Sequence, residues 1–220
     1  KFMIKKTYDV IMIQSSINNK KYLVRNLPDK QQAADLLAQM NNRFDNIISY
    51  LKNNNTNLFD VWKSHVAKNP GIKQDQLTEN QESEYKAFVE NIGRLLNNYD
   101  TDALSENTPN SAYTSYSENK GQKIVFCLRS KPGDVLMDLN TMMFVGIHEL
   151  AHLMTKSIGH EPEFWDNFNI LLRISISQNQ YKCQAFNSAG GAVDYCGTKI
   201  NDSPLRCEDV DRAKAGTTSK

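Results

Sequence analysis

The sequence lacks features that would assign it to several common classes of protein. No apolar run approaches the roughly 18 residues of a membrane span, and no signal-peptide pattern is visible. No Cys-x-x-Cys pair is present, so a zinc ribbon is not indicated. A charge of one sign is also lacking, because 26 Lys and Arg residues against 25 Asp and Glu residues give a net charge of +1. A general attraction to nucleic acid or to an anionic membrane is therefore not expected.

The chain of 220 residues is long enough for a domain with its own core. Apolar residues at helical spacing predict four longer helices and one short one, over residues 29–51, 79–98, 139–157, 163–177 and 59–66. Two hairpins are predicted over residues 8–25 and 112–129, and the polar residues 100–111 are predicted to form a surface loop. This mixed order of elements predicts the α+β class.

We expect these elements to form one domain over residues 1–211. Its predicted parts are a hairpin with helices over 1–100, a hairpin followed by two helices over 112–180, and an irregular region over 181–211. The polar residues 212–220 are expected to form a flexible tail, as chain ends without apolar anchors commonly do.

The candidate active centre is an H-E-x-x-H pattern inside the predicted helix 139–157, formed by His148, Glu149 and His152. Residues four apart lie on one face of a helix, so both imidazoles can reach one zinc ion. Glu149 can then act as general base on a water molecule in the open position of the metal. The alternative is that the two histidines are buried structural residues and that Glu149 forms a surface ion pair.

A catalytic zinc site needs a third protein ligand. His160 is the natural candidate, because it follows Gly159, where the chain can leave the helix and turn back. Three of the four histidines thus fall within residues 148–160, and the fourth, His65, is isolated and expected at the surface. Glu161 or Glu163 could replace His160 as the third ligand, as in zinc enzymes with a glutamate ligand.

Other residues near the motif leave alternatives open. The four cysteines are either buried thiols or disulfide partners: Cys127, Cys183, Cys196 and Cys207. The hairpin 112–129 either offers a strand edge to an extended peptide or is only part of the core. Three residues that follow the motif could stabilise the oxyanion of a tetrahedral intermediate, and the sequence does not select among them: Arg173, Tyr181 and Tyr195.

The stretch from His148 to Trp165, HELAHLMTKSIGHEPEFW, resembles the WLM and SprT-like metallopeptidases. Those families combine H-E-x-x-H with a downstream Gly-His or Pro-His and a nearby Glu-Phe or Glu-x-Phe. Here the downstream matches are Gly159, His160, Glu163 and Phe164. The resemblance implies a zincin-like fold, in which the active-site helix packs beside a small antiparallel sheet.

The same resemblance implies roles for individual residues. By it His148, His152 and His160 are zinc ligands, Glu149 is the catalytic glutamate, and the Phe-Trp pair at 164–165 packs the next helix beneath the site. Two departures limit the resemblance. The interval from His152 to His160 is longer than is usual for WLM proteins and shorter than in many SprT-like ones, and the C-terminal zinc ribbon of some SprT-like proteins has no counterpart.

Over most of its length the chain also resembles uncharacterised WLM-type metallopeptidases of large DNA viruses. Besides the metal helix, the similar segments are residues 22–38, 123–131 and 193–205. This resemblance implies a virus-encoded protein that is packaged in the particle and contacts capsid or other virion proteins. Because the chain begins with Lys1 rather than Met, an N-terminal membrane anchor could precede it.

These features together predict a zinc-dependent peptidase that acts on protein or peptide substrates. One alternative is a structural virion protein, either minor capsid or membrane-associated, that keeps the fold and has little activity. A second alternative is a DNA–protein crosslink protease, for which stimulation by single-stranded DNA would be the sign.

Overall fold

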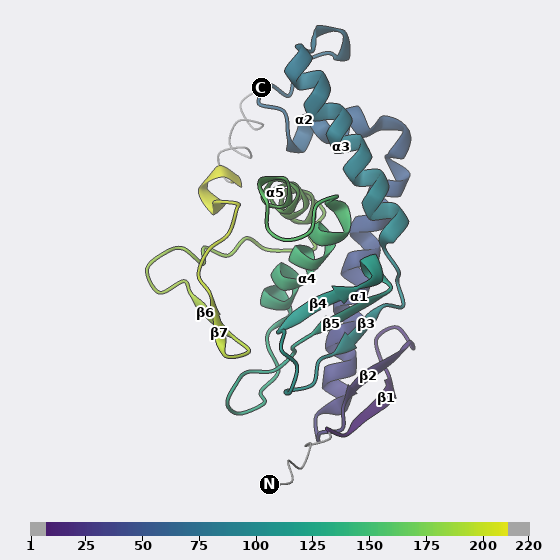
Figure 1. Ribbon diagram of the computed structural model, residues 1–220, viewed down its shortest axis with the longest axis vertical. Coiled ribbons are helices and arrows are strands. Elements are labelled where there is room, and N and C mark those ends of the chain that lie inside the picture. Colours follow the sequence, from purple (N-terminus) through teal and green to yellow (C-terminus); the bar gives the residue numbers. More distant parts are fainter. Residues whose placement is uncertain (1–7, 211–220) are drawn as a thin grey trace.

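Helix α1 (Lys30–Asn53) runs behind the strands and contacts β1, β2 and β3 as well as helices α3 and α4 (Figure 1). The computed structural model describes residues 8–210. The buried apolar residues of α1 recur three and four positions apart, which is the predicted stripe: Ala33, Leu36, Leu37, Met40, Phe44, Ile47, Ile48 and Leu51. The core of the fold therefore forms around this helix.

Two small sheets lie in front of α1. Strands β1 (Val10–Gln14) and β2 (Lys21–Arg25) form the first predicted hairpin and pair antiparallel. The second sheet has the order β3-β5-β4, with β3 (Leu104–Glu106), β4 (Ser115–Glu118) and β5 (Lys123–Phe126). Strands β4 and β5 are the second predicted hairpin, and β3 joins the other side of β5 in parallel, which makes this sheet mixed.

The prediction of a surface loop over residues 100–111 is wrong, because strand β3 within it is buried. Glu106 is only 4% exposed, and its carboxylate accepts hydrogen bonds from Arg129 Nε (2.5 Å) and from the backbone N–H of Arg25 (2.8 Å). The other side of the Arg129 guanidinium donates to both carboxylate oxygens of Asp29. In the sequence, a glutamate within a polar stretch looks like a surface residue. Its burial is possible because Arg129, which is distant in sequence, pairs with it.

The described residues form four further helices: α2 (Leu58–His65), α3 (Glu79–Asn98), α4 (Leu139–Met154) and α5 (Pro162–Ser177). Helix α3 has the predicted bounds, and Thr78 caps its start by accepting a hydrogen bond from the Gln81 N–H. Helix α4 ends at Met154, three residues before the predicted end, because the chain turns extended at Thr155. Short 3₁₀ helices cover Asn55–Asn57, Gln74–Gln76 and Asn119–Gly121.

The C-terminal segment 181–210 contains two short antiparallel strands, β6 (Val193–Tyr195) and β7 (Thr198–Ile200). Disulfides join Cys127 to Cys196 and Cys183 to Cys207. The four cysteines are therefore disulfide partners and not buried thiols. The predicted tail 212–220 lies outside the described residues.

The arrangement of helices and small sheets confirms the predicted α+β class. Within residues 8–210, no helix is both long enough and apolar enough to cross a membrane.

Candidate metal centre

Helix α4 carries the H-E-x-x-H pattern and is fixed at both ends. At its start, Asp138 Oδ1 accepts a hydrogen bond from the Thr141 N–H at 2.9 Å and caps the helix. At its end, two side chains of α3 donate to backbone carbonyls: Arg94 to Met154 (2.9 Å) and Asn98 to Leu153 (3.1 Å). The last carbonyls of a helix lack partners within it, and a cation there is favourable. Sequence reasoning missed both residues, because they lie more than 50 positions away.

Helix α4 also lies unusually close to α1, at Gly146. A Cβ atom on Gly146 would come within 2.2 Å of Cζ of Phe44, whose ring is fully buried. The missing side chain therefore lets the Phe44 ring pack directly on the backbone of the metal helix. This contact sets the position of α4 just before His148 and Glu149.

The loop after α4 brings His160 back toward the helix. Gly159 has φ +94°, a conformation that favours glycine, and Pro162 begins α5, where its fixed φ suits the first helical turn. The start of the loop is held by Asn167, whose Nδ2 donates to Thr155 Oγ1 at 2.9 Å. The turn that the sequence predicted at Gly159 is thus present.

The three predicted ligands converge. One potential ligand atom from each of His148, His152 and His160 lies within 4.8 Å of the other two, and Nε2 of His148 is 3.0 Å from Nε2 of His160. Tetrahedral zinc with Zn–N bonds of about 2.0–2.1 Å holds its nitrogen ligands about 3.3 Å apart. Three imidazoles at this spacing are therefore a donor set that fits a zinc ion and leaves one coordination position open.

Glu161 and Glu163 do not belong to this group, which is the only cluster of three or more potential metal ligands within residues 8–210. Glu163 instead accepts a hydrogen bond from Ser157 Oγ at 3.3 Å. Of the candidates for a third ligand, the geometry therefore favours His160.

Phe164 forms an apolar floor beneath the three imidazoles. Its fully buried ring stacks on His152 (centroids 4.3 Å apart, 27° between planes) and meets His148 and His160 edge-on at 5.0 and 4.7 Å. Trp165 is 43% exposed at the rim, and its Nε1 donates to the His160 carbonyl at 3.1 Å. The expected position of Phe164 beneath the site is correct, and Trp165 holds the loop instead.

The surroundings of His152 and His160 favour the neutral form of these two side chains. Burial lowers the pKa of His152 to about 4, and the neighbouring His148 adds to the shift. Burial also lowers the pKa of His160, again with a contribution from His148. Neutral imidazole is the form that binds a metal, because the coordinating nitrogen must carry a free lone pair.

Glu149 follows His148 on α4 and is only 4% exposed. One of its oxygens is 3.3 Å from Nδ1 of His148. Of the three residues considered for oxyanion stabilisation, Tyr195 is buried, and burial raises the pKa of its phenol, with a smaller contribution from the charge of Glu149. Tyr181 packs on Phe144, and Arg173 donates to Asn169.

Comparison with known proteins gives relatives of viral origin. No protein-family model matches the chain. The uncharacterized protein R325 of Acanthamoeba polyphaga mimivirus is 32% identical over 206 residues, which cover 93% of this chain and 90% of that protein. The chain therefore belongs to the family of the mimivirus protein R325. The expected likeness to viral proteins is confirmed by this match.

Two further relatives match a smaller part of the chain. The uncharacterized protein 042R of Invertebrate iridescent virus 3 is 40% identical over 68 residues, which are 30% of this chain and 42% of that protein. Among solved structures, Wss1 of Saccharomyces cerevisiae covers 48% of this chain and 86% of its own, with 20% identity and a TM-score of 0.34. The identity and the TM-score of the Wss1 match are too low to establish a shared fold.

Proposed function

We propose that this chain is a zinc-dependent peptidase that hydrolyses peptide bonds with water. The observation that carries the proposal is the convergence of His148, His152 and His160 beside the buried carboxylate of Glu149. Three protein ligands with one open position are typical of catalytic zinc sites, whereas structural sites have four protein ligands. A glutamate adjacent to the first ligand on the same helix supplies the general base.

Each residue would have a defined role. The three histidines would hold the metal, and bound zinc supplies Lewis-acid chemistry that polarises a carbonyl and makes water more acidic. Glu149 would accept the proton of the attacking water on its carboxylate and then donate it to the leaving amine nitrogen. Because Glu149 is 4% exposed, few bulk water molecules compete for that proton.

Strand β4 is the natural place for a peptide substrate. It contacts α4, and among the strands within residues 8–210 it pairs only with β5, so its other edge is not paired. An extended peptide can add to such an edge through main-chain hydrogen bonds. This arrangement supports protein or peptide substrates. The mimivirus relative supports a virus-encoded protein, and capsid or other virion proteins are the partners to test first.

The proposal is tested by metal content together with cleavage of unfolded casein. The purified wild type and Glu149→Gln are expected to hold about one zinc per chain, and His160→Ala is expected to lose it. Casein is expected to be cut by the wild type only, with Glu149→Gln lowering the rate by a factor of about 100 or more. His65→Gln is the matched control, because His65 lies outside the cluster.

Absence of zinc from the wild type, purified without chelator, would exclude the peptidase. Zinc in the wild type without cleavage of casein or of virion proteins would instead favour the structural virion role. We also propose that residues 1–211 form one domain, since α1 contacts the β1–β2 hairpin, strand β3 and the metal helix.

A further inference from the structure

The β6–β7 hairpin cannot hold its position by its own hydrogen bonds. Each strand has three residues, and within the described chain the two strands pair only with each other. Cys196 and Gly197 form the turn, both with positive φ (51° and 84°), which suits a two-residue hairpin turn. An isolated two-stranded hairpin is marginally stable at best, so other contacts must fix it.

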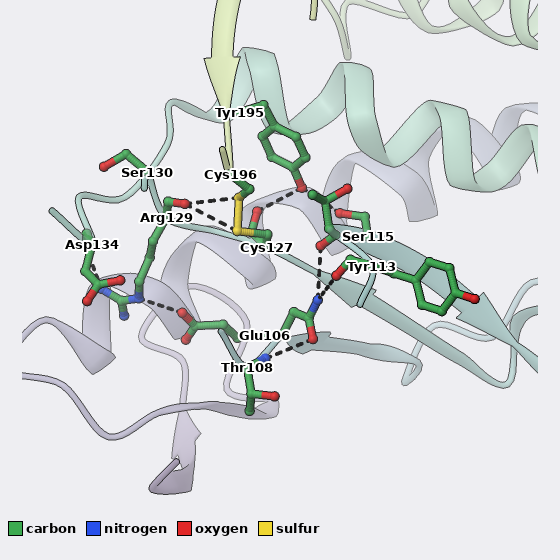
Figure 2. The surroundings of a disulfide bond; sticks show 12 residues. Glu106, Thr108, Tyr113, Ser115, Cys127, Arg129, Ser130, Asp134, Tyr195 and Cys196 are labelled. Atoms are coloured by element: carbon green, nitrogen blue, oxygen red, sulfur yellow. Dashed lines mark hydrogen bonds and ion pairs between the residues drawn. A yellow bond between two sulfur atoms is a disulfide. The ribbon is translucent and has the colours of Figure 1, made fainter. Parts of the chain in front are cut away.

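Those contacts join the hairpin to the sheet beside the metal helix (Figure 2). The Cys127–Cys196 disulfide connects the turn to the residue after β5. The hydroxyl of Tyr195 donates to the Cys127 carbonyl at 2.9 Å and shares a hydrogen bond of 2.5 Å with Ser115 Oγ. Tyr195 is 4% exposed and belongs to the core. The hairpin is thus anchored by one covalent bond and one buried side chain.

The contact with Ser115 links the hairpin to the strand that is proposed to bind substrate. Ser115 is the first residue of β4, the edge strand proposed to bind substrate, and it lies opposite Phe126 in the register with β5. Tyr195 therefore fixes the start of the substrate edge. Strand β4 in turn contacts α4, the helix that carries the proposed general base.

We propose that the β6–β7 hairpin is a redox-sensitive strap: the Cys127–Cys196 disulfide holds Tyr195 against Ser115 of the edge strand β4, and its reduction lowers peptidase turnover without releasing the metal. This inference rests on the proposed function. Tyr195 is a positioning residue, because it acts through Ser115 and strand β4. No metal ligand belongs to the strap.

A dithiol is the reductant that the chemistry requires. A thiolate of the dithiol attacks Sγ of Cys127, which is half-buried, whereas Cys196 is buried. The S–S bond breaks, the second thiol of the reductant releases Cys127, and two cysteine thiols form while the dithiol becomes a disulfide. Two electrons and two protons pass to the protein. The hairpin then keeps only the noncovalent contacts of Tyr195 and its neighbours.

The test compares two double variants of the whole chain, with hydrogen exchange, zinc content and casein cleavage as measurements. Cys127→Ser with Cys196→Ser removes the strap bond. Cys183→Ser with Cys207→Ser is the matched control, because that disulfide lies within the C-terminal segment. The strap variant is expected to keep its zinc, to exchange faster at residues 115–118 and 193–200, and to cut casein about tenfold more slowly. The control is expected to change none of these.

Tyr195→Phe separates positioning from general stability. It keeps the buried ring and removes both hydrogen bonds of the hydroxyl, so kcat is expected to fall several-fold and exchange at residues 115–118 to rise, with the disulfide intact. Unchanged exchange at residues 115–118 in the strap variant, or loss of its zinc, would overturn the strap. If the wild type itself cuts nothing, the proposed function fails, and the exchange measurement still decides whether the disulfide holds the edge strand.

Discussion

Helix α4 and the C-terminal segment 181–210 pack against each other at Phe144 and are stabilised in different ways. Twelve of the sixteen residues of α4 are buried, so burial of apolar surface holds it. In the segment 181–210 six of thirty residues are buried, and both disulfides end in it. A segment with so little core is held by cross-links, which restrict the unfolded chain.

The largest effect should come from removing the longer cross-link. Cys127→Ser with Cys196→Ser is expected to lower the free energy of unfolding by about 2–5 kcal/mol, measured by urea denaturation. The Cys183–Cys207 bond spans 24 residues instead of 69, so its removal should have an effect about 1 kcal/mol smaller. Equal losses would show that loop closure does not set the difference.

The packing of α4 is tested next, at Gly146. Gly146→Ala is expected to destabilise the protein by about 1–3 kcal/mol, because the new methyl group would overlap the buried Phe44 ring. Gly93→Ala is the matched control in α3, where nothing lies within 4 Å of the added carbon. It should stabilise the protein by about 0.5–1 kcal/mol, since alanine is the better helix former. Both values come from thermal denaturation, and a neutral Gly146→Ala would contradict the close approach.

A smaller effect, on the pH dependence of stability, is expected from replacing His65. This residue was predicted at the surface and is half-buried instead. Burial, with a contribution from the charge of Arg173, lowers its pKa to about 4. Between pH 6.5 and pH 4 the unfolded state binds a proton that the folded state does not, so stability is full above pH 6.5 and falls as pH decreases toward 4. His65→Gln should remove about 1 kcal/mol of this fall. An identical pH profile for the variant would contradict the assignment.

The smallest effect on stability is expected from replacing Ile158, which lies in the loop before His160. Its side chain is 97% exposed, so Ile158→Ser should change the free energy of unfolding by less than about 0.5 kcal/mol. Ile147→Ser, within α4 and fully buried, should destabilise the protein strongly in the same urea titration. A large loss for Ile158→Ser would mean that the loop packs against part of the chain.

The comparison also explains what the sequence could predict. Helix α4 and the return of the chain at Gly159 follow from local spacing, so the convergence of the three histidines could be predicted. Three other features could not be predicted from the sequence: the pairing of Glu106 with Arg129, the donors Arg94 and Asn98, and the choice of disulfide partners. Each depends on residues that are distant in sequence, and a polar residue shows its partner only in the folded chain.

The Cys127–Cys196 bond also turns residues 127–196 into a covalent ring that contains all three histidines. The exposed Lys156 lies within this ring, in the loop between the second and third histidine. A tryptic cut after Lys156 would thus leave both fragments attached to each other. They would migrate as one band on a non-reducing gel and separate only after reduction, so a nicked molecule would keep every proposed ligand in a single covalent particle.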